Sequence, residues 1–502
     1  MILITGLTLF AACWPFDGQT AGAQGQPAGA RRPHAAPRGA AGRKYSAQRL
    51  ARLVPRLMRE GDVPGLSVAL IRDARVVWHR GFGVSNADTK EPVGDGTVFE
   101  AASLSKPVFA YAVLKLVDAG KLALDRPLSE YAPEAYAGDD RRAALITARM
   151  VLEHTTGFQN EVGPAGPLKI HFTPGERFSY SGEGFLYLQR VVERITGEPL
   201  EAFMRETVFG PLGMTSSSFV WQERFGALKA YGHKTSGEVV QRRRPAAARA
   251  ASGLHTTALD YAKFVIAVMN GTGLRSETAG QMLRGRVPVD EGCSSCVGRS
   301  AGRLSRTLSW GLGWGVERTG AGDAIWHWGD NNGEFHNFVI AYPGEGAGVV
   351  IFTNSGNGLS IIPQIVSQAV GGEHPAFAWM GYESYNSPGK VLFMDILARG
   401  SAALSRYRDS RREGPGAGPL NEAQVNDLGY RLLGRRRVAE AVEVFKMNVE
   451  DFPGSSNAYD SLAEAYAANG DKGLAVINYR RSLELNPGNA NAAEMLRRLK
   501  DK

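Results

Sequence analysis

The sequence predicts an α+β domain with one sheet, followed by an all-α C-terminal region. Two runs of strand type, at 66–71 and 75–79, flank a polar turn and are expected to form a β-hairpin. Three more such runs, at 324–329, 335–342 and 348–353, return only after a long stretch of helix and loop signals. Two strands early and three late imply a sheet built from both ends of the domain, with helices inserted between them.

The all-α prediction rests on a period of 34 residues near the C-terminus. The period joins residues of matching type: Leu428 with Leu462, Ala441 with Ala475, Phe445 with Tyr479, and Pro453 with Pro487. This pattern resembles tetratricopeptide repeats, each of which is a helical hairpin. Because two repeats are few for independent stability, residues 491–500 are expected to cap them, and a helix over 391–412 is expected to pack against the repeats or the preceding domain.

The N-terminus predicts a signal peptide over 1–23 and a disordered linker over 24–44. The apolar run at 2–12 is too short to span a bilayer but suits a signal-peptide core. Residues 11–13 also resemble a bacterial lipoprotein box, so lipidation at Cys13 stays open as the one route to a membrane. By either route we expect export, to the periplasm or the medium. The linker has almost no large apolar residue, so it cannot bury enough surface to fold.

Charge and length limit the remaining assignments. The formal net charge of +8 is spread over 502 residues without interleaved aromatic side chains, so we expect no nucleic-acid partner.

We assign the α+β domain to 45–375, a connecting segment with a helix to 376–418, and the repeats to 419–502. The repeats contain no nucleophile and base at a useful spacing, so we expect them to bind a protein partner rather than to carry chemistry.

The chemistry is predicted to centre on Ser103, at the start of an apolar helix. Between residues 108 and 119 only Lys115 and Asp118 are charged, so this helix must be buried. Ser103 and Lys106 lie three residues apart and therefore share one face of the first turn. Burial and the positive end of the helix dipole both lower the pKa of such a lysine. A serine beside it can become a nucleophile.

Two other serine motifs compete with this assignment and are set aside. Ser387 and Lys390 have the same spacing, but Pro388-Gly389 between them predicts a turn that cannot hold both side chains on a helix face. Ser300 lies in a G-x-S-x-G sequence, but no hydrophobic strand precedes it, as the nucleophile elbow requires.

Cys293 and Cys296 form a C-x-x-C pair in a polar loop. One such pair is a poor zinc site, and no thioredoxin-like strand and helix surround it. In an oxidising compartment we therefore expect a small structural disulfide. We expect no metal and no cofactor.

Three motifs of the predicted domain follow one another in the order Ser103-x-x-Lys106, Tyr180-Ser181-Gly182 and His327-Trp328-Gly329. Together they resemble the serine β-lactamase and penicillin-binding protein family, and most of all its class C-like branch of D,D-peptidases, D-aminopeptidases and esterases. The resemblance covers about residues 46–372. It implies a β-lactamase/transpeptidase-like antiparallel sheet with an inserted helical region.

The resemblance also implies a mechanism. Ser103 forms an acyl-enzyme, and Lys106 and Tyr180 move its proton, with the choice of base between them left open. The backbone N–H groups of Ser103 and Asp330 form the oxyanion hole. Water, activated by Tyr180, then releases the acid. We interpret His154, which lies in a family-like stretch, as structural.

Departures from the family pattern guide the expected substrate. Gly182 replaces an asparagine that holds the acylamide side chain of the antibiotic, and His327 and Trp328 replace the lysine and hydroxyl residue that bind its carboxylate. These three residues and Gly329 are the predicted substrate-binding set. We expect hydrolysis of small esters, amides or D-amino-acid peptides, with slight turnover of β-lactams. The alternatives are a D,D-peptidase or β-lactamase, and a non-catalytic sensor coupled to a repeat scaffold.

Overall fold

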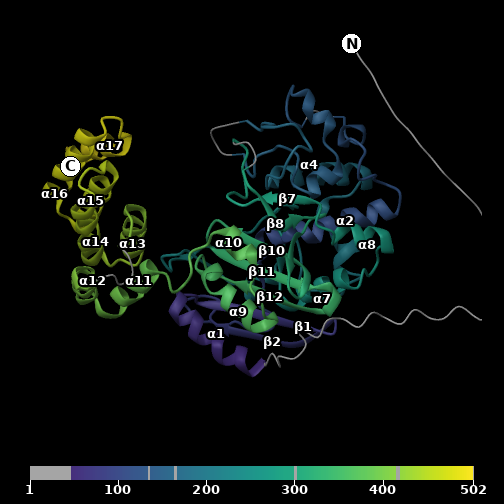
Figure 1. Cartoon of the computed structure of the whole chain (residues 1–502), viewed down its shortest axis with the longest axis horizontal. Helices are drawn as coiled ribbons and strands as arrows, with labels where there is room; N and C mark the ends of the chain where they lie inside the picture. Colours follow the sequence, from purple (N-terminus) through teal and green to yellow (C-terminus); the bar gives the residue numbers. More distant parts are fainter. Residues whose placement is uncertain (1–46, 134–135, 163–166, 299–301, 414–418, 501–502) are drawn as a thin grey trace, which may run out of the picture. The chain divides into compact units, whose positions relative to one another are not determined.

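The computed structural model describes most of the chain, and its described residues are 47–133, 136–162, 167–298, 302–413 and 419–500 (Figure 1). The predicted signal peptide, the linker and Cys13 lie outside these residues, and so does Ser300. None of the described helices is long and apolar enough to cross a membrane. From Arg43 to Lys502 the chain forms one compact unit. The predicted domain boundaries within this unit stay predictions.

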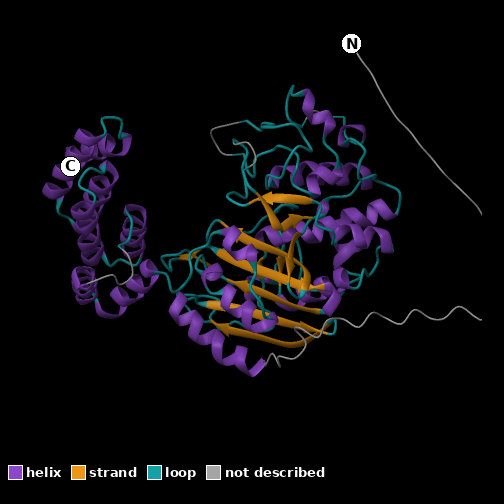
Figure 2. Cartoon of the chain, in the orientation of Figure 1, coloured by secondary structure: helices purple, strands orange, loops and turns teal. Residues whose placement is uncertain are grey.

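An eight-stranded antiparallel sheet dominates the described part of the N-terminal domain (Figure 2). Its order is β2-β1-β12-β11-β10-β9-β8-β7, so the two ends of the domain meet where β1 pairs with β12. This confirms the predicted α+β class and the sheet built from both ends. The strands are β1 Gly65–Arg72, β2 Arg75–Gly83, β7 Val287–Asp290, β8 Leu304–Trp310, β9 Gly315–Thr319, β10 Gly322–Asn331, β11 Phe335–Tyr342 and β12 Ala347–Thr353.

The sequence analysis missed β7, β8 and β9. β7 has four residues and contains Pro288, which weakens any strand signal. β8 has the sequence LSRTLSW, and its first four residues are exposed or half-buried. These three strands lie at one end of the sheet. A strand that buries only one face, or neither, carries few apolar residues, so its sequence shows little hydrophobic pattern.

Helices cover both faces of the sheet. Along β1, Leu66, Val68 and Leu70 pack in the core that holds α1 and α9, whereas Ala69 and Ile71 pack in the core that holds α2 and α7. Burial on both faces explains why this strand is apolar along its length. The helices are α1 Ala47–Gly61, α2 Ser105–Asp118, α3 Ala148–Leu152, α4 Gly182–Thr196, α5 Leu200–Met204, α6 Phe225–Leu228, α7 Ala258–Met269, α8 Ser276–Met282, α9 Ile362–Val370 and α10 Pro375–Met380.

The C-terminal part is all helical, as predicted. Its helices are α11 Pro388–Arg399, α12 Ser401–Glu413, α13 Glu422–Gly434, α14 Val438–Asp451, α15 Ser456–Asn469, α16 Lys472–Leu485 and α17 Ala490–Lys500. The single helix predicted over 391–412 is wrong, because Gly400 adopts φ +62° and separates α11 from α12. Ala441 and Ala475, 34 residues apart, are both fully buried. The assignment of these hairpins as tetratricopeptide repeats stays a prediction.

Candidate active site

Ser103 lies in a rigid 3₁₀ turn, η1 (Ala102–Leu104), directly before α2. Ala102 has φ +52°, a left-handed conformation that residues other than glycine rarely adopt. The turn is held on both sides, because Ser105 Oγ donates to Ala102 O at 2.6 Å and Tyr261 Oη donates to Leu104 O at 2.9 Å. Backbone strain of this kind persists only where surrounding contacts maintain it. The turn therefore fixes the direction in which Ser103 leaves the backbone.

Lys106 is buried beside Ser103 and bonds to it directly. Its Nζ lies 3.0 Å from Ser103 Oγ and donates to Ala251 O at 2.8 Å. The pKa of Lys106 is lowered to about 7, mainly by burial; the negative charge of Glu161 opposes this shift, and the positive charge of Arg249 adds to it. Near neutral pH a large share of Lys106 is thus uncharged and can accept the serine proton.

The ring of Tyr180 lies next to Lys106. The Lys106 Nζ lies 4.7 Å from the centroid of the tyrosine ring, and the ring of His154 stacks on it at 4.2 Å. Burial raises the pKa of Tyr180 well above its usual range, although its proximity to the Ser103 hydroxyl acts in the opposite direction. The Tyr180 hydroxyl is buried and has no hydrogen bond of normal geometry within the described part of the chain. It is therefore a neutral phenol that can give a proton.

His154 stacks on the ring of Tyr180 and helps to hold it in place. Its side chain is fully buried, and its Nδ1 accepts a hydrogen bond from Ser181 N at 3.0 Å. Burial lowers the pKa of His154 far below its ordinary value. Ser181 in turn caps α4, since its side chain accepts from Gly184 N at 3.1 Å. These contacts agree with a structural role for His154.

The third predicted motif lies on β10, next to the Ser103 turn. β9 pairs with β10 only as far as Trp326, and beyond it β10 contacts η1. Gly329 permits this approach, because a Cβ there would clash with the carbonyl of Ala101. Asp330 follows and lines the same cavity as Ser103, as the predicted oxyanion hole requires.

The predicted substrate-binding set is only partly exposed to that cavity. Trp328 and Gly182 line it, but His327 and Gly329 are not among its lining residues. His327 is fully buried, and its Nδ1 donates to Trp328 O at 2.8 Å. Burial, and then the charge of Lys106, lower the pKa of His327 to about 3. His327 and Gly329 therefore lie behind the residues that line the cavity, and their predicted contact with substrate stays a prediction.

Asn160 supplies an amide at the position where Gly182 lacks one. Gly182 N donates both to Asn160 O at 3.0 Å and to Asn160 Oδ1 at 2.9 Å. A Cβ at Gly182 would lie 2.8 Å from that carbonyl, so the glycine permits the close approach. Asn160 lines the cavity, and within the described residues its Nδ2 is not committed to another group. The family-like stretch that contains His154 ends before this asparagine, and no sequence motif marks it.

The cavity in front of Ser103 has a volume of about 380 Å³. Most of its wall is polar, and the charged side chains on it are Lys106, Glu161, Arg249 and Asp330. Asp330 is already engaged, since Tyr382 Oη donates to its Oδ2 at 2.8 Å and Gly333 N donates to its Oδ1 at 2.9 Å. The remaining lining residues are Ser103, Asn160, Tyr180, Gly182, Leu186, Ala251, Ser252, Ser294, Ser295, Trp328, Asn331, Asn332, Gly333 and Tyr382.

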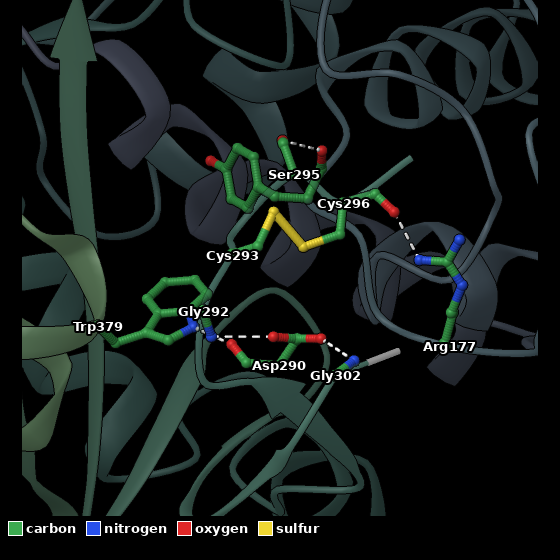
Figure 3. The surroundings of a disulfide bond; sticks show 9 residues. Arg177, Asp290, Gly292, Cys293, Ser295, Cys296, Gly302 and Trp379 are labelled. Atoms are coloured by element: carbon green, nitrogen blue, oxygen red, sulfur yellow. Dashed lines mark hydrogen bonds between the residues drawn. A yellow bond between two sulfur atoms is a disulfide. The ribbon is translucent and has the colours of Figure 1, made fainter. Parts of the chain in front are cut away.

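A disulfide joins Cys293 to Cys296 (Figure 3), and the two residues between them, Ser294 and Ser295, line the cavity. The loop it closes holds the catalytic candidate Tyr180 by its backbone, because Tyr180 N donates to Ser294 O at 2.8 Å and Ser295 Oγ donates to Tyr180 O at 2.9 Å. The C-x-x-C pair predicts the bond, but no sequence pattern indicates that it lies next to the cavity. The loop therefore forms part of the candidate site.

The second S-x-x-K motif lies away from the cavity. The predicted turn at Pro388-Gly389 is wrong, because α11 begins at Pro388 with Ser387 as its N-cap. Ser387 Oγ donates to Glu383 Oε1 at 2.5 Å, and Lys390 Nζ donates to Asn357 Oδ1 at 3.1 Å. The two side chains thus have separate partners.

No group of three or more His, Cys, Asp or Glu side chains in the described ranges is placed to hold a metal ion. A larger, mainly apolar cavity of about 710 Å³ lies against α11 and α12, and none of the predicted catalytic residues lines it.

Comparison with known proteins identifies the family. The sequence model of the family described as Beta-lactamase matches residues 50–361, more than half of the chain. The chain belongs to the beta-lactamase family. The resemblance to serine β-lactamases and penicillin-binding proteins is thereby confirmed for this domain.

Individual members of this family are distant from the chain. Penicillin-binding protein 4 of Amycolatopsis lactamdurans is 26% identical over 350 residues, which cover 63% of this chain and 87% of that protein. Protein flp of Staphylococcus aureus is 21% identical over 372 residues, which cover 69% of each. 

Solved structures of the family share the fold. The octameric penicillin-binding protein homologue from Pyrococcus abyssi has a TM-score of 0.54 and 22% identity, and the match covers 66% of this chain and 78% of that one. The D-alanine carboxypeptidase AmpC from Burkholderia cenocepacia has a TM-score of 0.53 and 18% identity, with 64% and 98% covered. At these identities the two structures show the fold alone.

Proposed function

We propose that the protein is an exported serine hydrolase that acts through an acyl-enzyme on Ser103. The observation that carries the proposal is the Lys106 Nζ, 3.0 Å from Ser103 Oγ, with a pKa lowered to about 7 at the floor of a cavity. Export is supported by the apolar N-terminal sequence and by the disulfide, a bond that persists in oxidising compartments.

In acylation, neutral Lys106 takes the proton of Ser103 as the serine oxygen attacks the substrate carbonyl. Lys106 suits the role of base better than Tyr180, because burial lowers the lysine pKa and raises the tyrosine pKa. The negative charge on the carbonyl oxygen is stabilised by the backbone N–H groups of Ser103 and Asp330. The Tyr180 hydroxyl then protonates the leaving group and recovers a proton from Lys106.

In deacylation, a water molecule replaces the leaving group. Tyr180 and Lys106 accept its proton in the reverse direction, and water attacks the ester carbonyl of the acylated Ser103. The tetrahedral intermediate collapses, Ser103 regains its proton, and the acid leaves. Every proton returns to its starting position, so the cycle needs only water as co-substrate.

We propose small esters and amides, including D-amino-acid amides and peptides, as substrates. The volume of about 380 Å³ suits a substrate of modest size. A D,D-peptidase acting on peptidoglycan peptides is the second candidate, and Asn160 favours it, because its Nδ2 is available to donate to a peptide carbonyl in the cavity. β-Lactams are expected to be poor substrates, since Gly182, His327 and Trp328 lack the amide, the ammonium and the hydroxyl group that the family pattern supplies for them.

The proposal is tested by labelling and by comparing substrates. A fluorophosphonate should form one adduct, mapped by mass spectrometry to Ser103. The values of kcat/KM for a short-chain nitrophenyl ester, a D-alanyl-D-alanine peptide and a chromogenic cephalosporin then rank the substrate classes. An adduct on Ser387 or Ser300, or no adduct on a folded protein, contradicts the proposed nucleophile. A cephalosporin turned over as fast as the ester contradicts the proposed substrate class.

A further inference from the structure

The charged groups on the cavity wall differ in whether they are already engaged. Lys106 is buried and bonds to Ser103 and Ala251, and Asp330 accepts hydrogen bonds from Tyr382 and Gly333. Arg249 and Glu161 are exposed on the wall instead. Within the described residues, neither side chain makes a hydrogen bond or an ion pair with another group. The cavity therefore offers one free cation and one free anion next to the nucleophile.

The backbone that carries Arg249 is fixed relative to the nucleophile. Gln189 on α4 clamps it from both sides, because its Nε2 donates to Ala248 O at 3.1 Å and its Oε1 accepts from Ala250 N at 2.8 Å. The next residue, Ala251, accepts the hydrogen bond from Lys106 Nζ. These contacts fix the backbone from which the Arg249 side chain reaches the cavity wall.

The same loop closes in a tight turn behind Arg249. Gly253 N donates to Arg249 O at 2.8 Å, and a Cβ on Gly253 would lie 2.9 Å from that oxygen. The charge of Arg249 lies close enough to Lys106 to affect its titration. A guanidinium on a fixed backbone at the cavity wall, with no partner among the described residues, is suited to a planar anion that arrives with the substrate.

We infer that Arg249 recognises a carboxylate on the substrate, so that the preferred esters, amides or peptides are anionic. This inference rests on the proposed hydrolase function and specifies its substrate class. A neutral substrate leaves Arg249 solvated, whereas a carboxylate gains a charge-assisted, bidentate hydrogen bond there. Glu161 repels the same group, and it therefore restricts the carboxylate to the Arg249 side of the cavity.

Two matched pairs of esters test the inference. Mono(4-nitrophenyl) glutarate against 4-nitrophenyl valerate places the charge on the acyl side, and 3-carboxyphenyl acetate against phenyl acetate places it on the leaving group. For at least one anionic ester, Arg249→Met should lower kcat/KM by about 10- to 100-fold, the usual effect of losing a hydrogen bond between charged groups. Both neutral esters should change less than threefold. Arg249→Lys should restore part of the loss.

Two other variants serve as controls in the same assay. Arg244→Met removes a nearby exposed arginine that lies over the Trp221 ring and not on the cavity wall, and it should leave all four esters unchanged. Glu161→Gln removes the repulsion and should raise kcat/KM for the favoured anionic ester a few-fold. Equal losses on anionic and neutral esters after Arg249→Met would indicate a structural role and overturn the inference.

The pH profile gives an independent readout with a neutral ester. Because Arg249 lowers the pKa of Lys106, Arg249→Met should move the acid limb of kcat/KM to higher pH, and Glu161→Gln should move it to lower pH. A profile that does not move in either variant shows that these charges do not reach the site. If no ester is hydrolysed and Ser103 takes no label, the proposed function itself fails, which is a separate outcome from the failure of Arg249 to discriminate.

Discussion

The chain contains two S-x-x-K motifs, and the two sites share most of the features that define such a pair. Lys106 and Lys390 are both buried, and burial lowers their pKa values to about 7 and about 8. They differ in the serine. Ser103 precedes its helix in a strained turn and bonds to Lys106, whereas Ser387 caps its helix and bonds to Glu383.

The comparison shows what the spacing leaves undetermined. At Ser387 the hydroxyl accepts from Lys390 N at 3.3 Å, so the cap directs it to the backbone and away from the lysine ammonium. Lys390 Nζ then donates to Asn357 Oδ1 instead. A lowered lysine pKa therefore follows from burial in both places. Only the turn before α2 combines it with a serine that faces the lysine and a cavity.

The largest difference between the sites should appear when each serine is removed. Ser103→Ala is expected to lower kcat for the nitrophenyl ester by about four to six orders of magnitude, the effect typical of losing a nucleophile. Ser387→Ala removes a helix cap and should leave kcat within about twofold, at a cost in stability of ~1 kcal/mol. Ester hydrolysis and thermal unfolding measure the two quantities. Residual turnover above this range in Ser103→Ala would mean that another group carries the acyl intermediate.

The two lysines should separate almost as clearly. Lys106→Met removes the group that accepts the serine proton, and kcat should fall by about two to four orders of magnitude. Lys390→Met removes a buried amine remote from the cavity, and kcat should stay within about threefold. Thermal unfolding verifies that each variant is folded, and fluorophosphonate labelling of Ser103 should persist in Lys390→Met but slow sharply in Lys106→Met. Comparable losses in both variants would show that the Lys390 region is coupled to the chemistry.

The pH dependence should assign one lysine to activity and the other to stability. Since Lys106 must be neutral to act, kcat/KM should fall about tenfold per pH unit below pH 7 and level off above it. For Lys390, the native pKa of about 8 lies below the value of 10.5 for a free lysine. Between these values the unfolded chain holds a proton that the native state has lost, so stability rises with pH.

The effect of Lys390 on stability is isolated by comparing the wild type with Lys390→Met. The free energy of unfolding of the wild type should rise relative to Lys390→Met between about pH 8 and pH 10.5, and the difference should be constant below pH 8. Urea unfolding at several pH values measures this difference.

The activity profile has its own contrary outcome. An acid limb of kcat/KM near pH 10, in place of one near pH 7, would point to Tyr180 as the base.

Local sequence patterns predicted the parts of this molecule that local interactions determine. The hairpin of β1 and β2, the apolar helix after Ser103 and the helical C-terminus all carry a pattern within a few residues. The misreading of Ser387 also has a local cause, because Pro388 occupies the first helical position, where proline is favoured, and can mark a helix start as well as a turn.

The missing parts depend on contacts between distant segments. β8 is a polar strand near the edge of the sheet, and it is defined by pairing with β7 and β9 rather than by its own composition. Asn160 and Arg249 belong to loops that reach the cavity through Gly182 and Gln189. No motif marks such residues, because their position follows from hydrogen bonds between segments more than 20 residues apart. The sequence therefore indicated the nucleophile but not the groups that surround the substrate.

The smallest effect on activity is expected from removing the C-terminal helices. Arg435 forms an ion pair with Asp62, Arg431 pairs with Glu383 at 3.2 Å, and a Cβ added at Gly434 would lie 2.5 Å from that of Ser236. These contacts join α13 and the loop after it to the rest of the compact unit, but among the described residues none beyond Tyr382 lines the cavity in front of Ser103. A chain ending at 418 should therefore keep kcat/KM for a small ester within about threefold while its melting temperature falls.

Arg431→Ala combined with Arg435→Ala in the full chain is the milder form of the same test. It removes the ion pairs of Arg431 with Glu383 and Asp427 and of Arg435 with Asp62, and it leaves the apolar side chains of the C-terminal helices packed together. Its kcat/KM should equal that of the wild type, since none of the residues of these pairs lines the cavity in front of Ser103. Fluorophosphonate labelling of Ser103 verifies the fold in both proteins. If either protein takes the label at the normal rate yet loses turnover, then the helices act on deacylation, and the catalytic site extends beyond the residues that surround Ser103.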